Sequence, residues 1–335
     1  MRWPIFTRAI VALRTWGRSS GARRLRALLP RPVRSMLHRA RNSVDHVPLW
    51  VVLPPAPAEP VPVRVVVFGN YFDDWLVRLS DTQTWQDVPG VAEVLLWPND
   101  PARPLPPPTA NARNVIIPLS EDDILDCPRT MDTLIPDRRA VGVLRNKASF
   151  AAYVEEAGLS ELCPVTYATR QQVRYPCIVK YVNAAFGLGS RILRSDRELE
   201  AFLSTEPWES GKFIIQQCLP TPVEYVTHCV CKGGRILWSC TFSFEKEAGQ
   251  EIRQGVVFRS MTAVDPPDGA LAAIERLLLP LAYDGPCNVD YALTPEGRIA
   301  VFEINPRFGG TLMLPINRGY LQQTLSCLIA NAGSP

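Results

Sequence analysis

The hydrophobic residues of the first half fall into short continuous runs, separated by polar and proline-rich stretches. Three of these runs predict buried strands: VRVVVF (63–68), AEVLLW (92–97) and NVIIP (114–118). A helix is expected around Trp75 to Leu79, between the first two runs. Strands that alternate with helices indicate a small open α/β domain.

After residue 140 the pattern changes to helical repeats and paired strands. LRNKASFAAYVEEAGL (144–159) has apolar residues at helical spacing, and Gly158 ends the helix. YPCIVKYV and SRILR predict two strands joined by a glycine-containing tip at residues 183–189. Further strands are predicted for PVTYA, KFIIQQCL, EYVTHCVC, RILWSCTFSF, CNVDYAL and RIAVFEI, and helices for DRELEAFL and ALAAIERLLLPLAY.

The last two predicted strands end in polar residues. A four-residue turn at 294–297 (TPEG) sets their register if Leu293 pairs with Arg298. In that register Asp290 and Glu303 are diagonal neighbours on adjacent strands. Strict alternation of side chains then puts these residues on one face: Asn288, Asp290, Ala292, Ile299, Val301, Glu303 and Asn305.

Two carboxylates on a largely apolar face repel each other and lose hydration, and a divalent cation compensates for both effects. Carboxylate and amide oxygens suit Mg²⁺, with Mn²⁺ as the alternative metal. The sequence therefore predicts a metal site formed by Asp290, Glu303 and Asn305, with the guanidinium of Arg307 close by. The competing interpretation is a solvated hairpin face with scattered charges.

These residues resemble the metal-binding end of the ATP-grasp superfamily, which includes D-alanine–D-alanine ligase, biotin carboxylase and carbamoyl phosphate synthetase. The resemblance rests on NVDYALTPEGRIAVFEINPRFGGT and extends over residues 140 to 330. It implies that Asp290, Glu303 and Asn305 hold Mg²⁺ ions that bridge the phosphates of ATP. It also implies that Arg307 is a catalytic residue that stabilises phosphate or an intermediate.

Two lysines match the superfamily in the right order. Lys147, at a helix start, resembles its first ATP-contacting lysine, and Lys180 resembles the second, which reaches the phosphates and acts in catalysis. The tip after Lys180 resembles a phosphate-covering flap, where Gly187 and Gly189 would let backbone N–H groups approach phosphate oxygens. Alone, each lysine is also typical of a protein surface. The charged loop 245–255 would either cover the site or be solvated.

FIIQQCLPTPVEY (213–225) resembles the superfamily's adenine hinge. The resemblance implies that Glu224 binds the ribose, and that the base is held by Gln216, Gln217, Cys218 and Leu219. Gln217 and Val223 stand where the superfamily more often has Glu and Gly, which leaves the register of the hinge open.

The resemblance implies an α/β (α+β) fold, in which a small pre-ATP-grasp α/β domain precedes a two-lobed ATP-grasp fold with ATP between two antiparallel-sheet lobes. The expected boundaries are 1–61 for a basic segment and Pro-rich linker, 62–140 for the first domain, 141–212 for the N-lobe and 213–335 for the C-lobe with the metal site. The implied activity is ATP- and Mg²⁺-dependent ligation of a small-molecule carboxylate to an amine or similar nucleophile, through an acyl phosphate. The alternatives are an ATP-grasp kinase or phosphotransferase, and a non-catalytic nucleotide-binding scaffold at a membrane or partner.

Charge is distributed unevenly along the chain. The net charge is +3, yet eleven arginines precede the first acidic residue, Asp45, and the remainder is acidic. The globular part therefore gives no sign of nucleic-acid binding. Residues 1–44 predict a basic amphipathic helix, which fits peripheral contact with an anionic membrane or docking on a protein partner. A disordered basic arm and a targeting peptide are the other interpretations.

Cysteine usage points to a reducing compartment. The nine cysteines form no CxxC pair, and no secretory signal is visible, so we expect reduced thiols in a cytoplasmic protein, with the inner face of a membrane as an alternative location. No apolar run approaches the ~18 residues of a membrane-spanning helix. The sequence indicates neither the oligomeric state nor the identity of the substrates.

Overall fold

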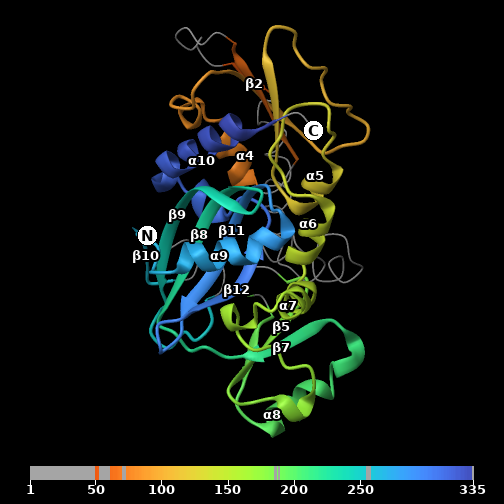
Figure 1. The fold of residues 1–335 in the computed structure, drawn as a ribbon, viewed down its shortest axis with the longest axis vertical. Helices are drawn as coiled ribbons and strands as arrows, with labels where there is room; N and C mark the ends of the chain where they lie inside the picture. The colour runs from red at the N-terminus through yellow and green to blue at the C-terminus, as the bar shows by residue number, and fades with distance from the viewer. Residues whose placement is uncertain are drawn as a thin grey trace, which may run out of the picture. The chain divides into compact units, whose positions relative to one another are not determined.

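Three β-sheets organise the described part of the chain (Figure 1). This computed structural model describes residues 50–52, 61–69, 73–184, 187, 189–253 and 258–333, all of which belong to the unit formed by residues 49–335. The predicted basic helix in residues 1–44 lies outside the described residues, as do Ala185, Phe186 and Leu188 of the glycine-containing tip.

The first sheet contains the three strands predicted from the continuous apolar runs. Its order is β1-β3-β2-β4, with β2 (Val63–Phe68) parallel to β3 (Val91–Trp97) and to β4 (Arg113–Pro118). Every residue of β2 is buried, which explains why its sequence is apolar without alternation. The predicted helix follows β2 as α4 (Asp73–Ser80). The antiparallel edge strand β1 (Trp50–Val52) was not predicted.

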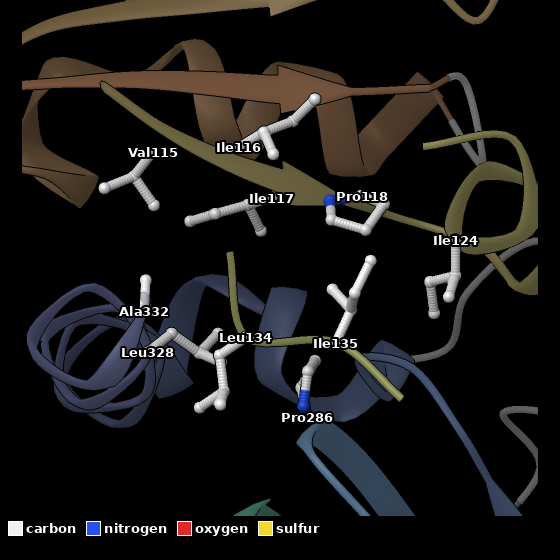
Figure 2. A pocket seen from close by; sticks show the side chains of 10 residues that line it. All are labelled: Val115, Ile116, Ile117, Pro118, Ile124, Leu134, Ile135, Pro286, Leu328 and Ala332. Atoms are coloured by element: carbon white, nitrogen blue, oxygen red, sulfur yellow. The ribbon is translucent and has the colours of Figure 1, made fainter. Parts of the chain in front are cut away.

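The first sheet packs against the last helix, α10 (Arg318–Asn331). Figure 2 shows side chains of β4 facing Leu328 and Ala332 across a small apolar cavity. Its volume of about 10 Å³ is at the lower limit for a single water molecule, and its lining is apolar, so it is a packing gap.

The small sheet has the order β6-β5-β7 and is antiparallel throughout. The predicted hairpin is confirmed as β5 (Cys177–Tyr181) and β6 (Arg191–Leu193), and β7 (Phe213–Gln217) pairs with the other edge of β5. Helix α8 (Asp196–Leu203) packs on this sheet through Leu199 and Phe202 (Figure 1). The predicted strand PVTYA is reduced to a bridge between Thr166 and Gln216.

The large sheet is also antiparallel, in the order β10-β9-β8-β11-β12. A buried apolar cluster joins one face of it to α9 (Ala270–Leu278). On the other face, the rings of Phe242 and Tyr320 of α10 lie 5.4 Å apart. The strands of this sheet are β8 (Val223–Lys232), β9 (Arg235–Glu245), β10 (Ser260–Val264), β11 (Gly285–Leu293) and β12 (Ile299–Asn305).

Three helices connect the first sheet to the small sheet: α5 (Glu121–Asp126), α6 (Arg138–Leu144) and α7 (Lys147–Glu156). The helix predicted within 144–159 is α7, which begins later than predicted because the side chain of Asn146 caps it there. Helices α5 and α6 were not predicted. Helix α10 and strand β10 were not predicted. The domain boundaries expected at residues 61, 140 and 212 stay predictions.

Candidate nucleotide and metal site

The geometry of the site begins with a turn and a β-bulge in the β11–β12 hairpin. Leu293 pairs with Ile299, and the backbone N–H of Thr294 bonds to the backbone oxygen of Arg298. The loop is therefore 295–297, one residue shorter than the predicted 294–297, and Gly297 in it has a φ of 79°. The predicted pairing of Leu293 with Arg298 is therefore wrong.

The bulge adds a second shift of one residue. Tyr291 pairs with Val301, whereas the next residue, Asp290, pairs with Glu303, so Phe302 is the extra residue. Val301 and Ile304 both lie in the apolar cluster under α9, which shows that the alternation of side chains reverses at Phe302.

Two consequences correct the predicted face. Ile299 and Val301 lie on the core face and not beside Glu303. Asp290 and Glu303 are directly opposite, rather than diagonal. Without the bulge, the shorter turn alone would put Glu303 on the core face, so the bulge is what brings the two carboxylates together.

The three predicted metal ligands converge. The amide nitrogen of Asn305 lies 3.3 Å from Asp290 Oδ2 and 3.3 Å from Glu303 Oε1. The donor set of two carboxylates and one amide fits Mg²⁺, and the Asn305 side chain would turn its oxygen toward the ion. No cluster of three or more His, Cys, Asp or Glu side chains suited to a metal is found in the described residues, so the fit depends on the amide.

Lysines from two other elements neutralise Glu303. Lys147, the first residue of α7, places Nζ 3.0 Å from Glu303 Oε2 and 2.7 Å from the backbone oxygen of Ala184. Lys180 of β5 lies over the ring of Phe302, with Nζ 5.2 Å from its centroid. The structure thus brings both predicted lysines to the end of the hairpin that carries Glu303.

The charges of the two carboxylates are compensated to different degrees. Burial raises the pKa of Asp290 to about 6, against the opposing effect of Arg253. Burial would also raise the pKa of Glu303, but Lys147 and Lys180 outweigh it and lower that pKa to about 2. Burial lowers the pKa of Lys180, and Glu303 acts against that shift.

Arg307 is held beside this group by a residue that the sequence did not single out. Its Nε lies 3.0 Å from Glu121 Oε1, at the start of α5, and its Nη2 lies 3.4 Å from Asn305 Oδ1. Both members of the ion pair are largely buried. The only sequence signal was an acidic helix start after Ser120, which by itself indicates capping.

The structure brings three of the four predicted hinge residues to a cavity. A cavity of about 370 Å³ is lined by Gln217, Cys218 and Leu219 and also by the turn between β11 and β12. Gln216 does not line it, because its side-chain amide donates to Thr166 Oγ1 at 2.9 Å. The backbone N–H groups of Gln217 and Cys218 already bond to other backbone oxygens, at 2.8 and 3.3 Å.

The predicted ribose acid, Glu224, is paired with two cations. Its carboxylate oxygens lie 2.9 Å from Lys246 Nζ and 2.9 Å from Arg253 Nε. Arg253 also donates to Asp290 Oδ1, so it bridges the predicted ribose and metal acids. In the predicted flap, Gly187 and Gly189 have φ of 66° and 74°, which favours glycine.

No protein-family model and no curated protein sequence matches the chain. Solved structures do match it. An L-amino acid ligase from Bacillus licheniformis is 14% identical, with a TM-score of 0.50, over 82% of this chain and 75% of that one. A D-alanine–D-alanine ligase from Bacillus anthracis is 11% identical, with a TM-score of 0.52, over 80% and 96%.

A phosphoribosylamine–glycine ligase from Thermotoga maritima is 15% identical, with a TM-score of 0.56, over 76% of this chain and 71% of that one. At these identities the likeness concerns the fold, and the chain has the ATP-grasp fold, with helices and antiparallel sheets as predicted. No helix in the described ranges is long and apolar enough to span a membrane.

Proposed function

We propose that the chain is an ATP- and Mg²⁺-dependent ligase that joins a carboxylate to an amine through an acyl phosphate. The observation that carries this proposal is the bulged hairpin, where Asp290 faces Glu303 and the amide of Asn305 contacts both. The fold shared with the three ligases supports it.

The same face supplies the charges for phosphoryl transfer. Asp290, Glu303 and Asn305 would hold Mg²⁺, which would supply positive charge against the negative charge that develops on the phosphates. Lys147 and Lys180 add fixed positive charge from α7 and β5, on the side of the small sheet. Because such chemistry needs positioning and charge more than a protein nucleophile, we assign none.

The nucleotide would extend from the 370 Å³ cavity to this hairpin. The base would lie beside Gln217, Cys218 and Leu219, and the ribose hydroxyls would bond to Glu224. Burial raises the pKa of the Cys163 and Cys218 thiols, which line the cavity, and the positive charge of Lys180 acts against both shifts. Lys180 therefore lies near the cavity, where it could reach a phosphate.

Two steps follow in the proposed reaction. A carboxylate oxygen of the substrate attacks the γ-phosphorus, and ADP leaves. The amine then attacks the acyl carbon, phosphate leaves, and the amine gives up a proton to form the amide. Arg307, fixed by Glu121, would hold the negative oxygens of the intermediate.

The test is a screen for ADP and phosphate release over pairs of carboxylic acids and amines in the presence of Mg²⁺. Asp290→Asn and Glu303→Gln should each abolish turnover, while Glu156→Gln, an exposed change at the end of α7 and away from the cavity, should leave it intact. Full turnover in both of the first two variants would remove the metal assignment.

Hydroxylamine distinguishes a ligase from a phosphotransferase. With the acid found in the screen, ATP and hydroxylamine, a ligase should form a hydroxamate from the acyl phosphate. A phosphorylated alcohol as product, with no hydroxamate, would instead establish the phosphotransferase alternative.

A further inference from the structure

One guanidinium lies between the two acids that nucleotide and metal would need. Arg253 Nε is 2.9 Å from Glu224 Oε2, and Nη2 of the same side chain donates to Asp290 Oδ1. The guanidinium carbon also lies 4.7 Å from the centroid of the Phe244 ring. Arg253 is largely buried, with 17% of its side chain exposed.

Both oxygens of Asp290 already accept hydrogen bonds. Oδ1 accepts from Arg253, and Oδ2 accepts from Asn288 at 3.2 Å and from Asn305 at 3.3 Å. An ion that binds Asp290 must therefore share the carboxylate with these donors or displace one of them. Of the three donors only Arg253 is a cation, and it alone lies outside the strands of the sheet.

Charge favours the removal of Arg253 over the removal of the amides. A divalent ion and a guanidinium on the same carboxylate repel each other, and this repulsion is strong where water is largely excluded. Conversely, buried Asp290 without any cation would face Glu303 uncompensated. The two positive charges are thus alternatives for one position.

The connections of Arg253 allow such an exchange. It follows β9 in the charged segment 246–253, where Lys246 Nζ donates to the backbone oxygen of Glu251 at 2.8 Å. The Glu251 side chain pairs with Arg194, which follows β6 of the small sheet, and both of these side chains are about half exposed. The segment therefore contacts both sheets through side chains, and its contact with β6 is easily broken.

We propose that Arg253 is a displaceable cation: it occupies the metal position at Asp290 in the nucleotide-free protein and leaves when the metal enters. This inference rests on the proposed metal site and concerns its regulation. Exchange of Arg253 for metal would couple metal entry to a movement of segment 246–253.

The experiment compares Arg253→Gln, Arg253→Lys and the control Arg259→Gln. Arg259 is an exposed arginine near the same loop, whose nearest acid, Glu245, is 3.9 Å away. Mn²⁺ alone is the first probe, with free ion measured by electron paramagnetic resonance. Mg²⁺ with the non-hydrolysable β,γ-imido analogue of ATP is the second, measured by calorimetry. Far-ultraviolet circular dichroism checks that each variant is folded.

Removal of the competing guanidinium should make Arg253→Gln bind Mn²⁺ about tenfold more tightly than the parent chain. The Mn²⁺ affinity of Arg253→Lys should lie between those of the parent chain and Arg253→Gln, because an ammonium cannot form the forked contact to both acids. Arg259→Gln should bind like the parent. Equal or weaker Mn²⁺ binding by Arg253→Gln would overturn the proposal, and if that variant does not fold, Arg253→Lys decides it.

The measurement with Mg²⁺ and the ATP analogue distinguishes displacement of Arg253 from a role in which Arg253 binds phosphate. Tighter binding of the analogue by Arg253→Gln supports displacement, and weaker binding would show that Arg253 contacts the bound nucleotide instead. If the parent chain binds no analogue, the proposed ligase function fails, while the Mn²⁺ measurement still decides whether Arg253 competes with a metal.

Discussion

The turn that carries Arg307 rests directly on a buried histidine, and this contact can be tested with one methyl group. A Cβ added at Gly309 would lie 2.3 Å from Cε1 and 2.8 Å from Nδ1 of His228. Gly309 has φ −94° and ψ 146°, an extended conformation that alanine adopts freely, so the substitution acts through overlap and not through backbone strain. Gly310 is the matched control, since a Cβ there meets nothing within 4 Å.

The overlap sets the size of the effect. Carbon atoms in contact prefer about 3.5–4.0 Å, so the ring or the turn must move by more than about 1 Å. The ring has little freedom, because His228 is 1% exposed and meets the Phe242 ring edge-on at 5.8 Å. Overpacking of this kind costs about 1–3 kcal/mol. Both glycine-to-alanine changes reduce the entropy of the unfolded chain alike, so the difference between them isolates the overlap.

Urea unfolding of the two variants measures this difference. Gly309→Ala should be less stable than Gly310→Ala by about 1–3 kcal/mol, and its turnover should fall because the shifted turn carries Arg307. In the double variant Gly309→Ala with His228→Ala, the space left by the ring should recover most of the loss, as a coupling energy. Equal stability of the two single variants would show that the histidine moves away freely, which would refute the argument.

Three further predictions concern single side chains. Lys180→Met should weaken ATP binding by about tenfold or more, as measured by calorimetry, and unchanged affinity would remove its role. Glu121→Gln should lower turnover because Arg307 loses its charged partner, whereas Asp122→Asn, an exposed neighbour on the same helix, should not; equal rates would contradict this. Burial and, to a lesser extent, Arg307 lower the pKa of His228 from 6.5 to about 3, so below pH 6.5 the unfolded chain gains a proton that the native chain does not. Between pH 6.5 and pH 5 the free energy of unfolding of the parent should fall by about 2 kcal/mol more than that of His228→Gln. The same pH dependence of this free energy in both proteins would contradict the prediction.

The sequence predicted that three polar side chains converge at the end of this hairpin, and they do so for a different reason. Asp290, Glu303 and Asn305 converge as expected, although the predicted register was wrong by two residues. The turn shifts the register by one residue, and the bulge at Phe302 shifts it by another. Because each shift of one residue moves a side chain to the opposite face, the two together restore the original face. Nothing in the run RIAVFEIN marks Phe302 as a bulge, because regular alternation accounts for its pattern equally well.

The sequence pattern did not predict contacts between segments that are distant along the chain. Glu121 reaches Arg307 from a helix that follows the first sheet, and Arg253 reaches Asp290 from a loop. Each residue, read locally, is an ordinary cap or a solvated charge, and only the packing of separate elements makes it a partner. The same applies to α10, whose apolar residues were not recognised as a helix that covers the face opposite α9.

The arrangement of charges suggests a common role for these distant contacts in the proposed site. Glu224, Asp290 and Glu303 come from three adjacent strands of one sheet, and their cations come from outside it: Lys246 and Arg253 from the segment after β9, and Lys147 from α7. A sheet fixes the positions of its own carboxylates, whereas a loop and a helix start can move relative to it. A nucleotide with its metal would bring both signs of charge to the same place, so it could exchange partners with these groups without leaving a buried charge unpaired. In the proposed site the sheet therefore carries the negative charges, and the elements around it carry the positive charges that binding would rearrange.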